Sequence, residues 1–197
     1  MYPDSLRTLI ESFKYLPGIG EKTAERLSFS ILEMSDEKIE LFAKSVSDVK
    51  KKIHKCPVCN TLTEGDLCEI CIDQNRNKKL LCVVEDVKNV FLLEKLGTYS
   101  GMYHVLSGLI SPLDGINPED IGIDQLIKRI KEEKFEEIIL AFKPSIEGET
   151  TALYISKIFE DTPVIVSKIA HGVPLGTDME YIDSLTLEMA LEDRKNI

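Results

Sequence analysis

The first 55 residues place apolar and polar side chains with the spacing of helices. The apolar positions of the first stretch recur every three or four residues, at Leu6, Leu9, Ile10 and Phe13. This spacing predicts a helix that begins at an N-cap formed by Asp4 or Ser5. A proline and two glycines interrupt the pattern at residues 16–20, and it resumes in two more stretches. These predict helices from about residue 21 to 32 and from a cap at Ser35 to the lysines at 50–52.

From residue 80 the pattern changes to short apolar runs separated by helical stretches. The runs cover residues 80–84, 103–106, 138–142 and 164–166, and the helical stretches lie near 86–96, 123–134 and 149–160. Apolar strands that alternate with helices are typical of a mainly parallel sheet covered on both faces. A last helix is predicted over 178–193, with Thr177 or Asp178 as its cap. The pattern therefore predicts an α+β protein with a helical N-terminal region and an α/β domain.

Four of the five cysteines form two close pairs. Cys56-Pro-Val-Cys59 and Cys68-Glu-Ile-Cys71 are separated by eight residues. Two such turns supply the four thiolates that Zn²⁺ prefers, and a site with four protein ligands has no open position for catalysis. The alternative is two unrelated pairs or a redox motif, but a redox pair normally follows a strand, and these lie in a loop. The residues predict a structural zinc knuckle, and we expect the fifth cysteine, Cys82, to be buried.

Residues 16–26 match a helix-hairpin-helix motif. The turn Leu16-Pro-Gly-Ile-Gly20 lets the backbone approach a phosphate, and the next helix begins there with its free amides and positive dipole end. Lys22 and Arg26 are four residues apart, so they share one face of that helix. We therefore expect the DNA backbone to be bound by Gly18, Gly20, Lys22 and Arg26. The alternative is a plain helical hairpin in which Glu21 and Glu25 pair with the two cations.

Carboxylates follow two of the expected strands. Glu85 comes after the first, and Lys143-Pro-Ser-Ile-Glu-Gly-Glu149 comes after the third. This layout resembles a Toprim domain, in which a glutamate and an Asp-x-Asp motif hold Mg²⁺ for phosphoryl chemistry. Glu85 matches the glutamate, but Lys143 and Ser145 occupy the aspartate positions, and a lysine there would repel the metal. The sequence predicts the fold without a complete metal site. The open alternative is a Mg²⁺-dependent phosphotransferase or nuclease that uses Glu85, Glu147 and Glu149.

The order of these parts resembles the RecR family of bacterial recombination mediators. The similarity covers essentially the whole chain and is most specific in five stretches: LPGIGEKTAERL, CPVCNTLTEGDLCEIC, YHVLSGLISPLDGI, PSIEGETTALYI and IAHGVPLGTDMEYID. Lys143 departs from the family, which usually has asparagine before this proline. The resemblance implies a helix-hairpin-helix region at 1–55, a four-cysteine zinc finger at 56–79, a Toprim domain at 80–175 and a C-terminal oligomerisation segment at 176–197.

The resemblance also implies a function. Members of the family are not enzymes and act with RecO and RecF to load RecA recombinase onto single-stranded DNA coated by single-strand-binding protein. They form homo-oligomers from dimers to tetrameric rings, through N-terminal helices and exchanged C-terminal segments. By this resemblance the four cysteines hold one zinc ion, Lys22 and Arg26 line the ring, and Glu147 and Glu149 bind a partner. His171 is then an interface or buried residue rather than a catalytic base.

The net charge of −10 argues against nucleic acid as a partner until it is divided along the chain. Residues 1–55 carry 10 basic and 9 acidic side chains, residues 56–79 carry 3 and 4, and residues 80–197 carry 11 and 21. The excess of acid therefore lies on the α/β part, and the hairpin region stays available to DNA. No apolar run is long enough for a membrane helix, and the first ten residues lack the layout of a signal peptide. We expect a bacterial cytoplasmic protein that associates with the nucleoid.

Overall fold

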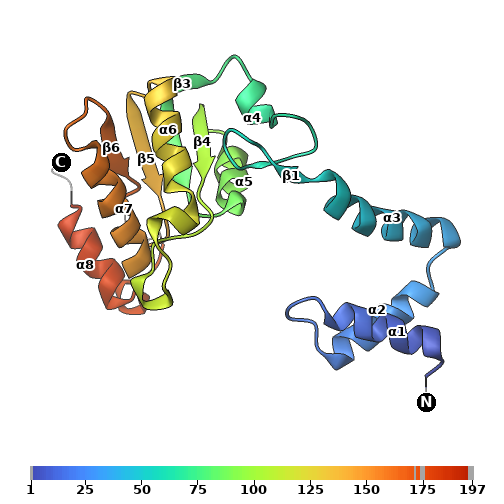
Figure 1. The fold of residues 1–197 in the computed structure, drawn as a ribbon. Helices are drawn as coiled ribbons and strands as arrows, with labels where there is room; N and C mark the ends of the chain where they lie inside the picture. The colour runs from blue at the N-terminus through green and yellow to red at the C-terminus, as the bar shows by residue number, and fades with distance from the viewer. Residues whose placement is uncertain (1, 171, 174–175, 195–197) are drawn as a thin grey trace. The chain divides into compact units, whose positions relative to one another are not determined.

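The fold is described from a computed structural model, which covers residues 2–170, 172–173 and 176–194 (Figure 1). The chain divides into two compact units, Met1–Ile53 and His54–Ile197. Each unit is described by itself.

The N-terminal unit consists of three helices, α1 (Asp4–Lys14), α2 (Glu21–Leu32) and α3 (Asp36–Lys52). The α1 and α2 helices lie side by side (Figure 1), and Ile10 of α1 and Ala24 of α2 are buried. The predicted bounds of α2 are confirmed. The predicted cap of α1 is wrong, because the helix begins after Pro3 and Asp4 instead forms an ion pair with Arg7 in the first turn.

The α3 helix carries an apolar face that the described chain leaves uncovered. Phe42, Val46 and Val49 are all exposed, and no residue of α3 is buried. The helix ends in three lysines, which favour the negative end of the helix dipole. The spacing of these apolar residues is typical of a face that packs against another element. Within the described residues, no element covers this face of α3.

The second unit is built on four parallel strands, β3 (Asn77–Val84), β4 (Gly101–Val105), β5 (Glu137–Ala141) and β6 (Ile165–Lys168). Their order is β4-β3-β5-β6. Val84 lies opposite Val105 on one side and Ala141 on the other, so three strands end at the same edge of the sheet. The predicted parallel α/β sheet is confirmed, and its C-terminal edge is where such sheets place ligand sites.

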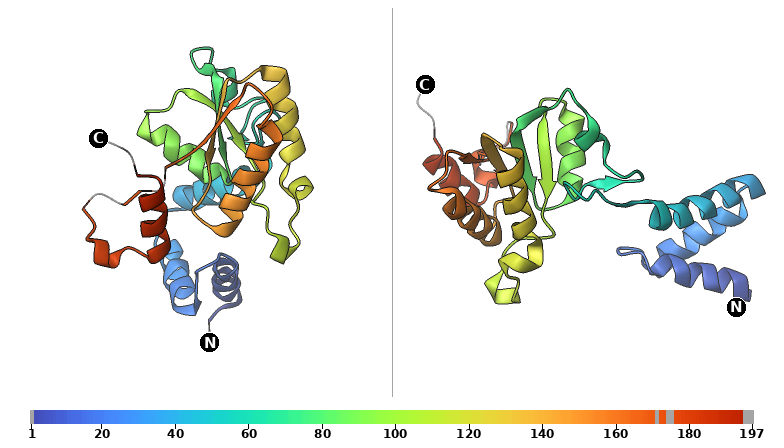
Figure 2. Two further views of the ribbon diagram at one scale, coloured as in Figure 1. Left: turned by 90° about the vertical axis from the view of Figure 1, so that its left-hand side faces the viewer. Right: turned by 45° about the horizontal axis from the view of Figure 1, so that its top comes forward.

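Helices cover both faces of this sheet (Figures 1 and 2). On one face α5 (Val87–Leu96) packs Val90 against Cys82, Val84 and Tyr103. On the other, α6 (Ile123–Glu133) and α7 (Ile146–Phe159) cover the core. That core includes Leu81, Val83, Leu126, Ile130, Ile138, Leu140, Ile155 and Phe159. Successive residues of a strand point to opposite faces, which explains the two clusters. Cys82 is buried, as predicted.

The zinc-finger region adds a short hairpin and one turn of helix. Strand β1 (His54–Lys55) pairs antiparallel with β2 (Leu62–Thr63), and α4 (Glu69–Ile72) follows. Between β4 and α6 the chain forms two 3₁₀ turns, η1 (Pro112–Asp114) and η2 (Pro118–Ile121).

The C-terminal helix α8 (Ser184–Glu192) is shorter than the sequence predicts. Residues Met179–Tyr181 form a separate 3₁₀ turn, η3, and the side chain of Asp183 accepts a hydrogen bond from the Thr186 N–H at 2.9 Å. The predicted cap at Thr177 or Asp178 is therefore wrong, because Asp183 caps the helix instead. No residue of α8 is buried.

Candidate metal centre and nucleic-acid interface

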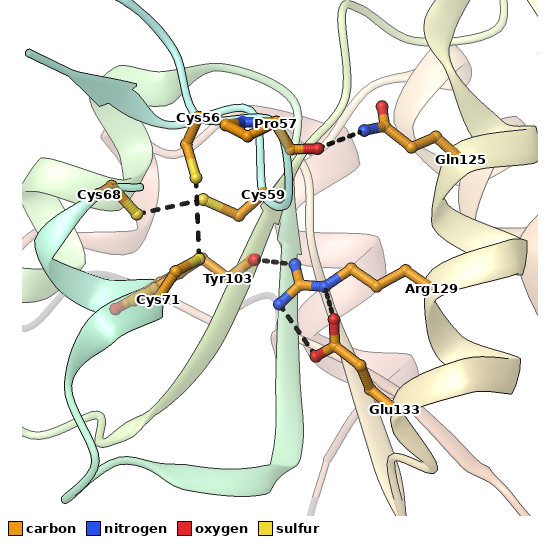
Figure 3. A network of polar contacts seen from close by, with 9 residues as sticks. All are labelled: Cys56, Pro57, Cys59, Cys68, Cys71, Tyr103, Gln125, Arg129 and Glu133. Atoms are coloured by element: carbon orange, nitrogen blue, oxygen red, sulfur yellow. Dashed lines mark hydrogen bonds and ion pairs between the residues drawn. The ribbon is translucent and has the colours of Figure 1, made fainter. Parts of the chain in front are cut away.

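The four paired cysteines converge on one point (Figure 3). Their sulfur atoms all lie within 4.8 Å of one another. The Cys59 and Cys68 sulfurs are 3.4 Å apart, and those of Cys56 and Cys71 are 3.9 Å apart. Four thiolates about 2.3 Å from a tetrahedral Zn²⁺ lie about 3.8 Å from each other, so the cluster has the size of a zinc site.

Local backbone geometry points the thiols inward. The Asn60 N–H donates to the Cys56 carbonyl at 2.9 Å, which closes the first turn. Asn60 adopts a positive φ of 63°, a conformation that asparagine tolerates better than most residues. In the second pair Cys68 is the N-cap of α4, and the Cys71 N–H donates to its carbonyl at 3.0 Å. Each Cys-x-x-Cys segment therefore directs two sulfurs to the same centre.

The close approach of the four cysteine sulfurs favours a bound cation. The hydrogen bond with Cys68 raises the pKa of the Cys59 thiol. The neighbouring sulfurs of Cys59 and Cys68 likewise raise the pKa of Cys71. A second thiolate beside an existing one is unfavourable, and a divalent cation removes that repulsion. The geometry and chemistry of the cluster fit one structural Zn²⁺, as predicted.

Hydrogen bonds connect the zinc knuckle to the edge strand β4 and to α6. The Val105 N–H donates to the Cys59 carbonyl at 2.8 Å, and the Asn60 side chain donates to the Val105 carbonyl at 3.0 Å. Gln125 of α6 donates to the Pro57 carbonyl at 3.1 Å (Figure 3). The two bonds with Val105 satisfy backbone groups on the unpaired side of the edge strand β4, and the bond from Gln125 links the knuckle to α6. Sequence reasoning missed the roles of Asn60 and Gln125. Asn60 directly follows Cys59 in the cysteine motif, but nothing in the sequence pairs it with Val105, and Gln125 lies outside the motifs.

A buried arginine supports the same strand from α6. Arg129 is almost fully buried, donates to the Tyr103 carbonyl at 2.6 Å and pairs with Glu133 at 2.9 Å (Figure 3). A buried charge is tolerated when it is paired and hydrogen-bonded in this way. The bond to Tyr103 links α6 to β4, the strand that also contacts the zinc knuckle, and the pairing with Glu133 within α6 compensates the buried charge.

The hairpin turn has the open backbone that phosphate binding requires. Gly18 has a φ of +83°, which residues with a side chain rarely adopt. Gly20 is the N-cap of α2, and no side chain of the described residues caps this end of the helix. A Cβ atom at either glycine would meet nothing within 4 Å. The first amides of α2 therefore face an open approach.

The two cations of the hairpin lack the acid partners that a plain hairpin would give them. Glu21 pairs with Lys14 at 2.7 Å, and that hydrogen bond raises the pKa of the Lys14 ammonium. Glu25 accepts a hydrogen bond from the Tyr2 hydroxyl at 3.3 Å. Lys22 and Arg26 are exposed, and within the described parts of the chain no ion pair joins either of them to an acid.

The acids of the Toprim-like edge are engaged separately rather than gathered around one point. Glu85 accepts a hydrogen bond from the Lys143 N–H at 2.8 Å, and Glu149 pairs with Lys168 at 3.2 Å. The hydrogen bond from the Ser145 hydroxyl lowers the pKa of Glu147. Over residues 2–170, 172–173 and 176–194, only one group of three or more histidine, cysteine, aspartate or glutamate side chains lies close enough together to hold a metal. That group is the four cysteines of the knuckle. The structure therefore does not bring Glu85, Glu147 and Glu149 together as a metal site.

A helical hairpin, a four-cysteine knuckle and a four-stranded parallel sheet define a zinc-containing protein of the Toprim class with a separate helix-hairpin-helix unit. Family models match four successive parts of the chain. They are the RecR helix-hairpin-helix at residues 6–50, the RecR four-cysteine zinc finger domain at 53–73, the Toprim domain at 79–170, and the RecR C-terminal domain at 172–195. The chain belongs to the RecR family, and the resemblance seen in the sequence is confirmed.

Membership gives the protein a role in recombinational DNA repair and fits DNA binding. The zinc-finger match and the convergent sulfurs agree on one structural zinc ion. Among the described residues, no helix is long and apolar enough to cross a membrane. His171 lies outside the described residues, as does the end of the predicted C-terminal segment at 195–197.

Proposed function

We propose that this protein is a non-enzymatic recombination mediator that binds DNA through its hairpin. In this proposal it acts with RecO and RecF to load RecA onto single-stranded DNA coated by single-strand-binding protein. The observation that carries the proposal is the pair of exposed cations, Lys22 and Arg26, beside an uncapped helix N-terminus. Their neighbouring acids, Glu21 and Glu25, are occupied by Lys14 and Tyr2.

This arrangement suits the sugar-phosphate backbone rather than base edges. The backbone at Gly18 and Gly20 can approach a phosphate closely, and the amides and dipole of α2 attract its charge. Lys22 and Arg26 each neutralise a further phosphate without reading sequence. The binding is therefore non-specific, weak for one chain and strongly dependent on salt.

Uncovered apolar surfaces in both units favour assembly into a dimer or a tetrameric ring. The face of α3 that bears Phe42, Val46 and Val49 is exposed. Leu185 and Leu191 of α8 are exposed as well. Apolar surfaces of this kind gain stability when another copy covers them. The proposal assigns DNA binding to residues 1–55, zinc binding to 56–79, partner binding to the Toprim domain at 80–175 and oligomerisation to 176–197, with the helices of residues 1–55 as a second contact between copies.

The partner surface of the proposal is the first turn of α7. Glu147 and Glu149 are only partly buried there, on the half of the chain that carries the acidic excess. An acidic surface suits a basic protein partner and repels DNA from this side. Lys143 adds one positive charge at the same edge, where the family usually has asparagine.

The alternative enzyme would need a Mg²⁺ ion held by Glu85, Glu147 and Glu149. Glu85 instead holds the Lys143 N–H, which supports a structural role for this acid. Supercoiled plasmid incubated with the protein and Mg²⁺ tests the alternative. The proposal predicts no nicking. Nicking that disappears in the Glu85→Gln variant contradicts it.

The DNA-binding part is tested with a double variant and a charge-matched control. Lys22→Ala/Arg26→Ala removes both hairpin cations, and Lys128→Ala/Lys131→Ala removes two exposed cations of α6. Fluorescence anisotropy with labelled duplex and single-stranded DNA measures the Kd over a series of salt concentrations. We expect the hairpin variant to bind at least about tenfold more weakly, with a salt slope smaller by about two. Equal losses in both double variants, or none in the hairpin variant, contradict the assignment.

A further inference from the structure

The loop after β4 presents a fully exposed leucine on a rigid turn. Leu113 lies in η1 and is 100% exposed. On either side of it Ser111 and Ile116 exchange two backbone hydrogen bonds, of 3.1 and 2.9 Å. The Ser111 hydroxyl donates to the Asp114 carboxylate at 2.6 Å, and Gly115 closes the turn with a φ of +71°. This network fixes the turn and leaves the Leu113 side chain in solvent.

The base of the loop is joined to the turn that carries the proposed partner-binding acids. The Ile110 N–H donates to the Thr151 hydroxyl at 2.8 Å, and that hydroxyl donates to the Glu147 carbonyl at 2.7 Å. Thr151 is completely buried, so water does not compete for either bond. The loop and the first turn of α7 are therefore held together by one side chain.

Charge restricts the kind of molecule that this loop can meet. Residues 106–127 contain four acids, Asp114, Glu119, Asp120 and Asp124, and no lysine or arginine. All four are exposed. A phosphate backbone would be repelled, whereas a protein pocket that is apolar inside and basic at its rim is complementary to an exposed leucine among acids.

We propose that Leu113 is the apolar anchor of the surface that contains Glu147 and Glu149. It inserts into an apolar pocket of a protein partner, and lysine or arginine side chains at the rim of that pocket face the acids. This inference rests on the proposed function, which supplies a protein partner for the Toprim domain. The turn that carries Leu113 is held by hydrogen bonds before binding, so little backbone entropy is lost when the pocket closes on the side chain.

The test measures binding of full-length variants to purified RecO by isothermal titration calorimetry, with RecF as a second probe. Leu113→Ser removes the anchor, and Leu113→Met keeps an apolar side chain of similar volume. Leu92→Ser is the matched control, since Leu92 lies on α5 and is 61% exposed. Leu113 is fully exposed and Leu92 is mostly exposed, so we expect all three variants to fold, which circular dichroism and zinc content verify.

We expect Leu113→Ser to weaken binding of at least one probe by about tenfold or more. Leu113→Met should stay within about threefold of the wild type, and Leu92→Ser should not change it. Unchanged binding by Leu113→Ser overturns the inference. So does a loss of oligomer size by light scattering with partner binding intact, because the pocket would then belong to a second copy. If the wild type itself binds neither probe, the partner claim of the proposed function fails, and this inference fails with it.

Discussion

The carboxylate of Glu85 accepts a hydrogen bond of 2.8 Å from the backbone N–H of Lys143, and this bond joins the ends of β3 and β5. The two residues are 58 positions apart in the chain. They occupy the positions at which the Toprim resemblance places magnesium ligands. In this protein the Glu85 carboxylate binds the backbone of the loop after β5, and the Lys143 side chain is a cation rather than a metal ligand. The Toprim fold is thus present, and the carboxylate of Glu85 is engaged by the backbone of the loop that follows β5.

Replacing Glu85 tests this structural role. Glu85→Ala leaves the Lys143 N–H without its acceptor, so we expect the free energy of unfolding to fall by about 1–2 kcal/mol. Glu85→Gln keeps an acceptor oxygen and should lose less than half of that. Urea unfolding followed by circular dichroism gives both values. A Glu85→Ala variant as stable as the wild type would show that the bond contributes nothing.

Removal of zinc should loosen the sheet edge as well as the knuckle. Cys68→Ser takes away one of four ligands, and we expect the purified variant to hold much less than one zinc per chain. The Val105 N–H, which donates to the Cys59 carbonyl, should then exchange faster with deuterium. The Ala24 N–H in the helical N-terminal unit should keep its exchange rate.

Cys82→Ala is the control for that experiment, because Cys82 is buried in β3 and is not part of the sulfur cluster. It should retain the full zinc content. Full zinc in Cys68→Ser, or its loss in Cys82→Ala, would contradict the ligand assignment.

A buried histidine predicts loss of stability in mild acid. His104 on β4 is completely buried, and neither ring nitrogen has a hydrogen-bond partner in the described chain. Burial, with a smaller effect of the Arg129 charge, lowers its pKa to about 3. In the unfolded chain the His104 ring therefore becomes protonated near pH 6.5, whereas in the folded chain it stays neutral down to about pH 3. This contribution to stability is complete above pH 6.5 and is lost as the pH falls from there toward 3.

The expected loss is about 1.4 kcal/mol for each pH unit in that range. Urea unfolding at pH 7 and pH 5 measures it, with His104→Phe as the comparison, since phenylalanine has a similar ring and does not titrate. The variant should show a shallower decline in the free energy of unfolding. Equal slopes for the two proteins would mean that other groups cause the acid sensitivity.

The sequence predicts best those features that depend on residues close together in the chain. The bounds of α2 follow from the glycine turn and the apolar spacing after it, and the four zinc ligands follow from two local turns. The parallel sheet follows from apolar strands that alternate with helices. Each of these signals is strong because it follows from one local requirement: a turn that needs glycine, a metal that needs four ligands, or a strand that must be buried on both faces.

Features that depend on distant residues were not predictable. Asn60 bonds the knuckle to β4 across 45 positions and Gln125 bonds it to α6 across 68 positions, and no local pattern predicts either bond. The hydrogen bond from Tyr2 to Glu25 likewise depends on the packing of α1 against α2, which the sequence does not show. The start of α8 was misplaced because two competing caps, Asp178 and Asp183, precede one apolar stretch.

The central claim, a mediator that holds DNA through its hairpin, is tested most directly by RecA loading. RecA's DNA-dependent ATP hydrolysis is followed on single-stranded DNA coated by single-strand-binding protein, with RecO present. The wild type should shorten the lag before hydrolysis, as should the Lys128→Ala/Lys131→Ala control. Lys22→Ala/Arg26→Ala should leave the lag close to its length without the protein. A hairpin variant that shortens the lag as much as the wild type would contradict the account.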